Sequence, residues 1–410
     1  MKFAHMADCH IGGWREPQLK ELGIKAFFRA VDVSLTKNVD FILISGDLFN
    51  TALPDIDSLR NVVKKLKEVK DKGVNVYIIP GSHDFSPSGK TMIDVLEKAG
   101  LVINVVKGKM VNDKLRLDFT EDRITNAKIT GMVGRRNMLE KTDYGILDYK
   151  YLENEPGFKI FMFHTALDEF KPEELSKMDS SSISILPKGF NYYAGGHVHF
   201  VMKEKQEKYG TVVFPGPVFP NNFRELERLK HGGFYIWDEG RLEYIDLKMK
   251  NVIALTLNAE NKSSEKVEME INELTEKENI KDSIVLIRVE GKLDSGKPYD
   301  INFKEIFNNL EKKRAYFVMK NTSKLTSKEF EEIKVKEGSV EEIENTLIDK
   351  SGEQVNTGNM AKKIKDLLSS PNTVKTLMHL LSSPIKEGEK KYAYEERIKK
   401  ETDELFGLKN

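Results

Sequence analysis

Short apolar runs alternate with amphipathic stretches over residues 1–250 of the chain. Short apolar runs are typical of buried strands, and apolar residues that fall on one stripe indicate a helix. The predicted strands are Lys2–Ala7, Phe41–Ser45, Val74–Pro80, Lys128–Val133, Lys159–Phe163 and Tyr192–Ala194. The clearest predicted helix, Asp57–Lys72, lies between the second and third strands. This alternation predicts an α/β fold with layered, mixed sheets.

The pattern changes after residue 250. Residues 251–333 are predicted to form a small α+β domain in the order strand, helix, strand, helix, strand. Residues 334–359 are polar and contain several glycines, which is typical of a linker. Residues 360–410 regain helical periodicity and carry more apolar side chains than so short a segment can bury alone. This C-terminal helical tail is therefore expected to dock on another surface.

Polar clusters follow five of the predicted strands and hold five of the eight histidines. Their candidate functional residues are Asp8, His10, Asp47, Ser82, His83, His164, His197 and His199. Ligands of open α/β sheets bind beyond the carboxyl ends of the strands, so these clusters are expected to converge on one site. We also expect Asp8 and His10 to alternate on extended chain, with both side chains pointing to one side. The same alternation is expected of His197 and His199.

Each cluster alone has an ordinary structural explanation. Asp47 suits a turn at the end of a strand, and His164 suits a hydrogen-bonded position in the core. Together, imidazole and carboxylate groups in this order favour a site for two divalent cations held side by side. Such a pair of cations is suited to the hydrolysis of phosphate esters.

The order of the clusters and their residues resemble the motifs of the calcineurin-like metallophosphoesterases. One of these clusters is Gly46-Asp47-Leu48-Phe49-Asn50. With its tail, the chain is similar to the archaeal SbcD-type nuclease subunit of the double-strand-break repair complex. The resemblance implies these metal ligands: Asp8, His10 and His199 for the first ion, Ser82, His164 and His197 for the second, and Asp47 as the bridge. It also implies that His83 contacts the scissile phosphate without binding a metal.

The same resemblance implies an activity and partners. The chain would be a DNA nuclease with two Mn²⁺ ions per subunit, a 3′–5′ double-strand exonuclease and single-strand endonuclease that processes broken DNA ends. Residues 251–333 would cap the active site and guide DNA, and residues 360–410 would bind an SMC-like coiled-coil ATPase. Helices near 57–72 and 91–101 correspond to the family's homodimer interface, although their periodicity alone favours ordinary packing on the sheet.

Two positions depart from the family pattern. The chain has Ser82 where the family usually has asparagine, whose amide reaches further, so weaker binding of the second metal is expected. Asn50 stands where related nucleases often carry a histidine near the phosphate, which predicts a different exonuclease efficiency. Arg135 and Arg136 follow a strand and are candidates for contacts with DNA phosphates, with a solvated surface as the equal alternative.

Composition narrows the class of protein only slightly. Lysine plus arginine and aspartate plus glutamate total 65 each, so a nucleic-acid enzyme would need a local basic face. The single cysteine, Cys9, excludes an internal disulfide framework and is expected to lie in the core, as is His5. No apolar run approaches membrane-spanning length, so a cytoplasmic protein without membrane contact, nucleoid-associated in a prokaryote, is expected.

Two other functions stay open at this point. One is a metallophosphodiesterase or phosphatase for small substrates, which has little need for the second domain and the tail. The other is a weakly catalytic DNA-end scaffold that keeps the fold but binds its second metal poorly at Ser82.

Overall fold

The computed structural model describes residues 1–85, 89–135, 139–173, 177–328, 370–384, 386, 389 and 391–406. The chain divides into two compact units. The first comprises Met1–Asn258, Glu268–Val289 and Asn302–Lys324, and the second comprises Ala259–Val267, Glu290–Ile301 and Leu325–Asn410. The candidate site residues that the structure describes all lie in the first unit.

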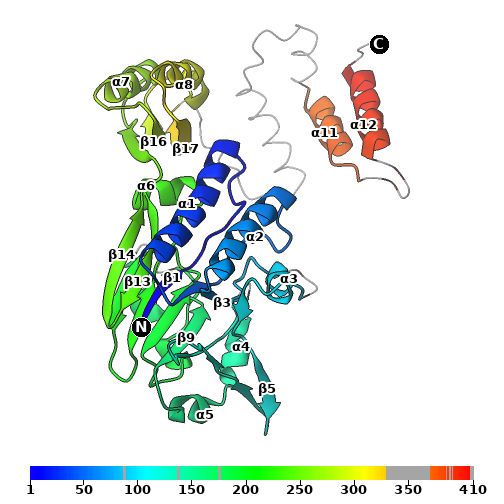
Figure 1. Cartoon of the computed structure of the whole chain (residues 1–410). Coiled ribbons are helices and arrows are strands. Elements are labelled where there is room, and N and C mark those ends of the chain that lie inside the picture. Colours follow the sequence, from blue (N-terminus) through cyan, green and yellow to red (C-terminus); the bar gives the residue numbers. More distant parts are fainter. Residues whose placement is uncertain are drawn as a thin grey trace. The chain divides into compact units, whose positions relative to one another are not determined.

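Two six-stranded sheets form the centre of the first unit (Figure 1). One has the order β14 (Arg241–Leu247), β13 (Gly232–Asp238), β1 (Lys2–Met6), β2 (Phe41–Ser45), β3 (Asn75–Ile79), β4 (Ile103–Asn104). The other has the order β11 (Met202–Lys205), β12 (Thr211–Phe214), β10 (Tyr192–Gly196), β9 (Lys159–His164), β8 (Lys128–Gly131), β7 (Thr120–Glu121). A separate hairpin pairs β5 (Gly108–Val111) with β6 (Lys114–Leu117).

Both sheets are mixed, as predicted. Strands β1 to β4 run parallel, and so do β8, β9, β10 and β12. Strands β7, β11, β13 and β14 are antiparallel to their neighbours. All six predicted strands are present with ends shifted by a few residues at most, and the predicted fold class is confirmed.

The two sheets share one apolar core. Phe3 of the first sheet stacks on Phe41 and meets Tyr192 of the second sheet edge-on, with ring centroids 5.0 Å apart in both pairs. Ile129, Met162 and other side chains of the second sheet join the same cluster. The inner faces of the sheets therefore pack on each other, which holds the carboxyl ends of both sets of parallel strands at fixed positions.

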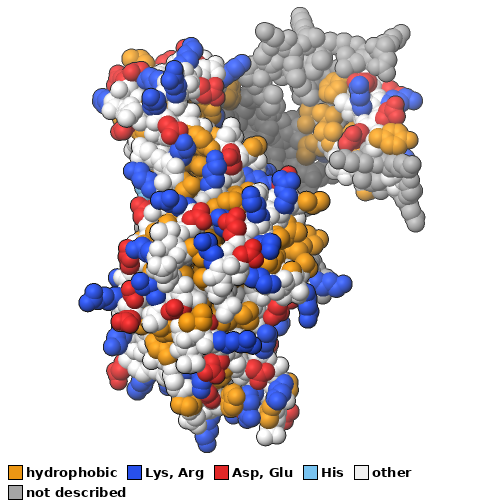
Figure 2. Space-filling view, in the orientation of Figure 1, with side chains coloured by type: hydrophobic (Ala, Val, Ile, Leu, Met, Phe, Trp, Pro, Cys, Tyr) orange, Lys and Arg blue, Asp and Glu red, His pale blue; other side chains and the backbone are white. Residues whose placement is uncertain are grey.

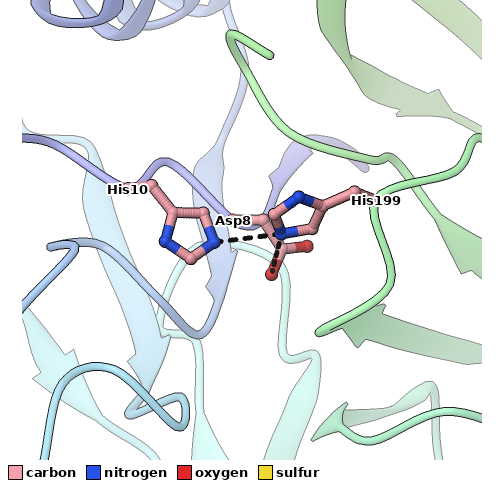
Figure 3. Close-up of side chains that lie close together, drawn as sticks. All are labelled: Asp8, His10 and His199. Carbon is pink, nitrogen blue, oxygen red and sulfur yellow. Dashed lines mark hydrogen bonds and ion pairs between the residues drawn. The ribbon is translucent and has the colours of Figure 1, made fainter. Parts of the chain in front are cut away.

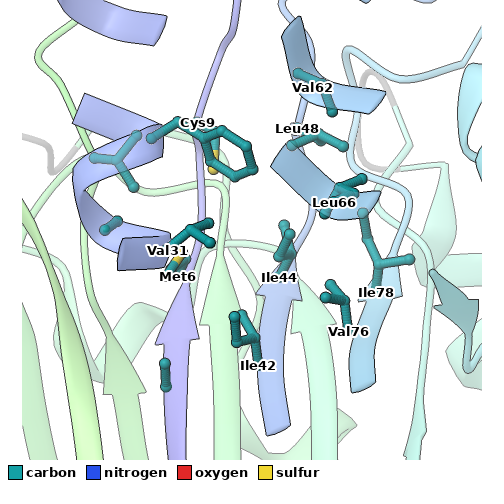
Figure 4. Close-up of a cluster of buried hydrophobic side chains, with 14 of the residues drawn as sticks. Met6, Cys9, Val31, Ile42, Ile44, Leu48, Val62, Leu66, Val76 and Ile78 are labelled. Atoms are coloured by element: carbon teal, nitrogen blue, oxygen red, sulfur yellow. The ribbon is translucent and has the colours of Figure 1, made fainter. Parts of the chain in front are cut away.

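Helices cover the outer face of the first sheet. They are α1 (Pro17–Thr36), α2 (Ile56–Asp71) and α3 (Met92–Lys98). Figure 4 shows Leu66 of α2 beside Ile44 and Ile78 of the sheet, and Val62 of α2 beside Leu48, in one buried cluster. The Asp55 side chain caps α2 by accepting a hydrogen bond from the Ser58 N–H at 3.0 Å, which fixes where the helix begins.

Shorter helices cover the outer face of the second sheet. They are α4 (Glu140–Gly145), α5 (Tyr149–Asn154) and the 3₁₀ turns η2 (Asp168–Phe170) and η4 (Ile183–Ile185). Tyr144 and Leu152 pack with Phe161 and Phe163 in their own apolar cluster. The order of layers is therefore helix, sheet, sheet, helix.

The predicted order of strand, helix, strand, helix and strand appears after residue 250. The elements are β15 (Asn251–Asn258), α7 (Ser264–Glu276), β16 (Ser283–Leu293), the 3₁₀ turn η5 (Pro298–Asp300), α8 (Phe303–Lys312) and β17 (Phe317–Ser327). The strands form a three-stranded sheet with the order β15-β16-β17. The capping role and the boundaries predicted for residues 251–333 stay predictions.

The tail contains two helices in its described part, α11 (Pro371–Leu381) and α12 (Lys391–Phe406). The predicted linker, residues 334–359, lies outside the described residues. Across the part of the chain that the structure describes, no helix is both long and apolar enough to span a membrane. Basic and acidic side chains are interspersed over the face shown in Figure 2, in keeping with their equal totals of 65.

Candidate metal centre

Asp8 and His10 lie just beyond the end of β1, at Met6, and leave the extended conformation there. Their φ angles are 50° and 42°, in the left-handed region. The Asp8 N–H donates to the Gly46 carbonyl at 3.1 Å, and the His10 N–H donates to the Asp47 carbonyl at 2.9 Å. The expectation that the two side chains alternate on an extended strand is therefore wrong. The Asp8 and His10 side chains reach the site because the backbone turns there while it keeps its hydrogen bonds to the segment after β2.

His197 departs from the predicted alternation in the same way. Strand β10 ends at Gly196, and His197 follows with φ of 80°. Its backbone N–H donates to Asp8 Oδ1 at 2.9 Å, which joins the loop after β10 to the loop after β1. This bond crosses between the two sheets and fixes the Asp8 carboxylate.

Asp8, His10 and His199 form the group predicted for the first metal (Figure 3). Their ligand atoms all lie within 4.8 Å of one another. His10 Nε2 and His199 Nε2 are 3.0 Å apart, and His199 Nε2 is 3.9 Å from Asp8 Oδ1. Residues separated by almost 200 positions thus present nitrogen and oxygen atoms to one point.

Asp47 lies between this group and a second one. Its Oδ2 is 3.7 Å from His10 Nε2 and 3.2 Å from His164 Nε2. Asp8, Asp47 and His164 also bring ligand atoms within 4.8 Å of one another. Asp47 is therefore shared by the two groups, and its role as a bridge between two metal ions stays a prediction.

The remaining residues predicted for the second metal lie at the same edge of the sheets. The His197 ring is 5.2 Å from the His164 ring, centroid to centroid. Ser82 is buried in the turn that follows β3. The individual metal-binding roles of His164, His197 and Ser82 stay predictions from the resemblance.

His83 lies beside the proposed ligands. Its ring is 4.8 Å from the His10 ring, and it shares a group of close ligand atoms with His10 and Asp47. The His83 backbone N–H donates to Asp47 Oδ1 at 2.8 Å, and its Nδ1 donates to the Asn50 carbonyl at 2.9 Å. Because a carbonyl only accepts, the proton lies on Nδ1, and Nε2 is the ring nitrogen that can meet a substrate.

Two further histidines are oriented through their Nδ1 atoms. His164 Nδ1 donates to the Ser45 carbonyl at 2.8 Å, and His199 Nδ1 donates to Glu225 Oε1 at 2.8 Å. Such contacts are typical around metal-binding histidines, because they fix the tautomer and the ring orientation. Glu225 was not predicted from the sequence. Its spacing from Asn222 signals only the start of a helix, and no local pattern connects it with His199.

Burial shifts the titration of the site strongly. It raises the pKa of Asp8 to about 6 and lowers the pKa values of His10 and His197 to about 3. Burial also lowers the pKa of His164, but the adjacent Asp47 carboxylate outweighs it and raises this pKa to about 10. The centre is a buried set of mutually dependent charges rather than a surface acidic patch.

The residues present fit divalent metal ions. Asp8 Oδ2 and His10 Nδ1 are buried and, among the described residues, have no hydrogen-bond partner. Unpartnered buried polar atoms are costly unless another group satisfies them, and a cation would satisfy the carboxylate oxygen. Mixed imidazole and carboxylate donors suit manganese, iron or zinc.

Two glycines make the close approach of the strand ends possible. Gly46 has φ of +87°, and a Cβ there would lie 2.1 Å from His164 Nδ1. A Cβ on Gly196 would lie 1.9 Å from the Ser45 carbonyl oxygen. Any side chain at either position would displace His164 or the end of β2.

The other sequence-based candidates have different outcomes. Asn50 borders the site, where its side-chain oxygen accepts a hydrogen bond from Asn221 Nδ2 at 3.2 Å. Arg135 forms an ion pair with Asp143 at 3.0 Å, and its predicted role in DNA contact stays a prediction. Arg136 lies outside the described residues.

The core positions predicted for Cys9 and His5 are confirmed. Cys9 is buried in the apolar cluster beneath α1 and α2. His5 is fully buried between the sheets, with its ring nitrogens 3.0 Å from the Tyr192 hydroxyl and the Ser45 hydroxyl. Neither residue belongs to the described groups of close ligand atoms.

Known proteins share sequence similarity with the part of the chain that carries this site. Residues 1–201 match the family model described as calcineurin-like phosphoesterase. The chain is 27% identical over 271 residues to a protein of Methanopyrus kandleri, covering 62% of this chain and 59% of that one. It is 24% identical to a protein of Methanococcus maripaludis (62% and 68% covered) and 26% identical to one of Archaeoglobus fulgidus (68% and 67%). All three relatives are named DNA double-strand break repair protein Mre11.

The family match covers the five strand ends that carry the site. The fold therefore implies a centre of two metal ions, for which the described side chains supply the groups. The alignment with the Methanopyrus protein spans less than two thirds of that protein's length. Residues 1–201 therefore have the fold of the calcineurin-like phosphoesterases, and the match supports the predicted enzyme class, a metal-dependent phosphodiesterase.

Proposed function

We propose that the chain is a manganese-dependent DNA nuclease that processes DNA ends in double-strand-break repair. It acts as a 3′–5′ double-strand exonuclease and as a single-strand endonuclease. The observation that carries the proposal is the convergence of carboxylates and imidazoles from separate strand ends on one buried centre. The names of the three relatives support DNA ends as the substrate.

Each residue has a proposed task. Asp8, His10 and His199 hold one ion, Asp47 bridges, and His164, His197 and Ser82 hold the other. When bound, the ions activate water and neutralise the charge of the phosphodiester. The protein supplies the fixed geometry, because the Asp47 carboxylate is held by the His83 N–H and the Asp8 carboxylate by the His197 N–H.

His83 is the proposed catalytic residue. Its ring is locked by the bond from Nδ1 to the Asn50 carbonyl, so Nε2 is directed away from the backbone. The ring lies against His10, which brings it close to the phosphate of a substrate bound at the metals. We assign His83 to contact the scissile phosphate and, when both ring nitrogens carry a proton, to give the Nε2 proton to the leaving oxygen.

The partners belong to the same proposal. Met378, Leu381 and Tyr392 of the tail helices are more than half exposed, which suits a helical segment that binds an SMC-like coiled-coil ATPase. Leu53, in the loop before α2, and Ile56, its first residue, are 77% and 82% exposed and suit a homodimer contact. In this proposal the small domain guides DNA, and the protein works in the cytoplasm near the nucleoid in the archaeal SbcD-type manner.

A nuclease assay tests the function. We expect degradation of linear double-stranded DNA and nicking of hairpin DNA with Mn²⁺, weaker activity with Mg²⁺ and none with a chelator. The His83→Ala variant should lose about 10²–10⁴-fold in kcat, as is usual for a lost proton-transfer group. It should still bind Mn²⁺, since His83 is not among the proposed ligands.

A chromogenic phosphodiester, assayed in parallel, separates the alternatives. Rapid turnover of that small substrate without action on DNA would contradict the nuclease and support a small-substrate phosphodiesterase. Full DNA degradation by the His83→Ala variant would instead indicate contaminating activity around a DNA-end scaffold.

A further inference from the structure

Helix α6 (Phe223–Leu229) holds His199 at two points. In its first turn, Glu225 Oε1 lies 2.8 Å from His199 Nδ1. In its last turn, the Arg228 guanidinium donates to the His199 carbonyl. The other oxygen of Glu225 accepts the Asn221 N–H at 2.8 Å, so the carboxylate is itself fixed. The Glu225 carboxylate therefore contacts Nδ1 of His199, while Nε2 of the same ring faces Asp8 and His10.

This contact decides which nitrogen of His199 carries the proton. The side chains of His199 and Glu225 are only 19% and 12% exposed, so their hydrogen bond is largely shielded from water. Glu225 Oε2 already accepts the Asn221 N–H, and a carboxylate oxygen accepts hydrogen bonds, so His199 is the donor in its bond to Oε1. The proton lies on Nδ1, and the lone pair of Nε2 points at the metal group.

The position of Glu225 is set by the fold rather than by His199. Leu226 is fully buried in an apolar cluster with Leu22 and Leu286. Glu227 pairs with Arg288 of β16 through two hydrogen bonds of 2.7 and 2.6 Å. These contacts anchor α6 independently of His199, so the helix presents Glu225 at a fixed place.

We propose that Glu225 is a positioning residue for the metal centre. It fixes the ring orientation and the tautomer of His199, and thereby the affinity of the first metal position. The inference rests on the proposed metal centre, in which His199 is a ligand. Contacts of this kind typically contribute 10–100-fold to metal affinity.

The test uses Glu225→Leu and Glu225→Gln in the full-length protein. Mn²⁺ affinity is measured by calorimetry, and the His199 tautomer by ¹⁵N-histidine NMR of the metal-free protein. We expect Glu225→Leu to weaken the first site about 10–100-fold and to mix the tautomers. Glu225→Gln should weaken binding less, because its amide oxygen can accept the same hydrogen bond without the charge.

Glu227→Gln is the matched control, since it makes the same chemical change two residues away, where the partner is Arg288. We expect lower stability with unchanged Mn²⁺ affinity and unchanged His199 tautomer. His199→Ala identifies the NMR signal and tests the ligand itself. If it binds Mn²⁺ as the wild type does, the proposed metal centre fails.

If His199→Ala loses the first site, the Glu225 variants decide the positioning role. Wild-type affinity together with a wild-type tautomer in Glu225→Leu overturns the inference. Should the leucine variant not fold, the same wild-type result in Glu225→Gln overturns it. Neither readout requires DNA cleavage, so a failure of the nuclease proposal is seen separately in the DNA assay.

Discussion

Four of the proposed ligands occupy backbone conformations that residues with side chains usually avoid. Asp8, His10, Asp47 and His197 have φ angles of 50°, 42°, 52° and 80°. The left-handed region costs about 1–2 kcal/mol for such residues. Such a conformation persists where surrounding contacts hold it. Here the backbone N–H groups of Asp8 and His10 are held by hydrogen bonds to the Gly46 and Asp47 carbonyls. The turns bring the side chains together at the cost of local strain.

Ser82 is the residue at which we expect the second metal to be held weakly. A serine hydroxyl reaches less far than the amide oxygen of asparagine. We expect Ser82→Asn to tighten the weaker Mn²⁺ site about tenfold, or ~1.4 kcal/mol, in calorimetry. The stronger site should be unchanged and serves as the internal control. Two equally tight sites in the wild-type protein would contradict the prediction.

Asn50 is the second residue where substitution should change the reaction. Its side chain borders the site and its carbonyl orients His83. We expect Asn50→His to place an imidazole near the phosphate and to shift the ratio of exonuclease to endonuclease activity several-fold. Asn50→Gln, which keeps an amide, is the control. An unchanged ratio in the histidine variant would refute the idea.

The sequence alone predicted which residues lie together at the metal centre, but not the backbone conformations that bring them there. The apolar runs before Asp8, Asp47 and His164 mark the ends of strands, and parallel strands end at a common edge. Periodicity carries no information about the chain beyond a strand, so the left-handed turns at Asp8 and His197 were missed. Glu225 was missed because its contact with His199 depends on how α6 packs.

Among the structural elements, the end of β2 lies so close to the ends of β9 and β10 that only glycine fits at positions 46 and 196. We expect Gly46→Ala to cost about 3 kcal/mol or more, because its Cβ would lie 2.1 Å from His164 Nδ1 and its φ is +87°. Urea denaturation of the metal-free protein measures this cost.

Gly73→Ala is the matched control for that substitution. Gly73 also has a positive φ, +75°, but nothing lies within 4 Å of a Cβ added there. Gly73→Ala should therefore lower the free energy of unfolding only by the backbone strain, about 1–2 kcal/mol. Equal unfolding midpoints for the two variants would show that the contact with His164 tolerates a methyl group.

For the whole molecule, the fold and the order of elements were predictable, because they depend on long periodic segments. The tail was predicted to be helical and to dock on another surface, and its partner, an SMC-like ATPase, was implied by the resemblance alone. We expect deletion of residues 360–410 to abolish co-purification with the SMC-like ATPase and to leave Mn²⁺-dependent cleavage of DNA within about twofold of the full chain. Retained association of the shortened chain would place the ATPase contact elsewhere.

The burial of Cys9 has a practical consequence for such measurements. It is the only cysteine of the chain, it is 2% exposed, and burial raises the pKa of its thiol, so little reactive thiolate is available. The wild-type chain is therefore a ready background for maleimide chemistry. A cysteine introduced on an exposed surface can carry a fluorophore or a spin label while the native thiol stays in place. Distances to DNA or to a partner then become measurable without first altering the core.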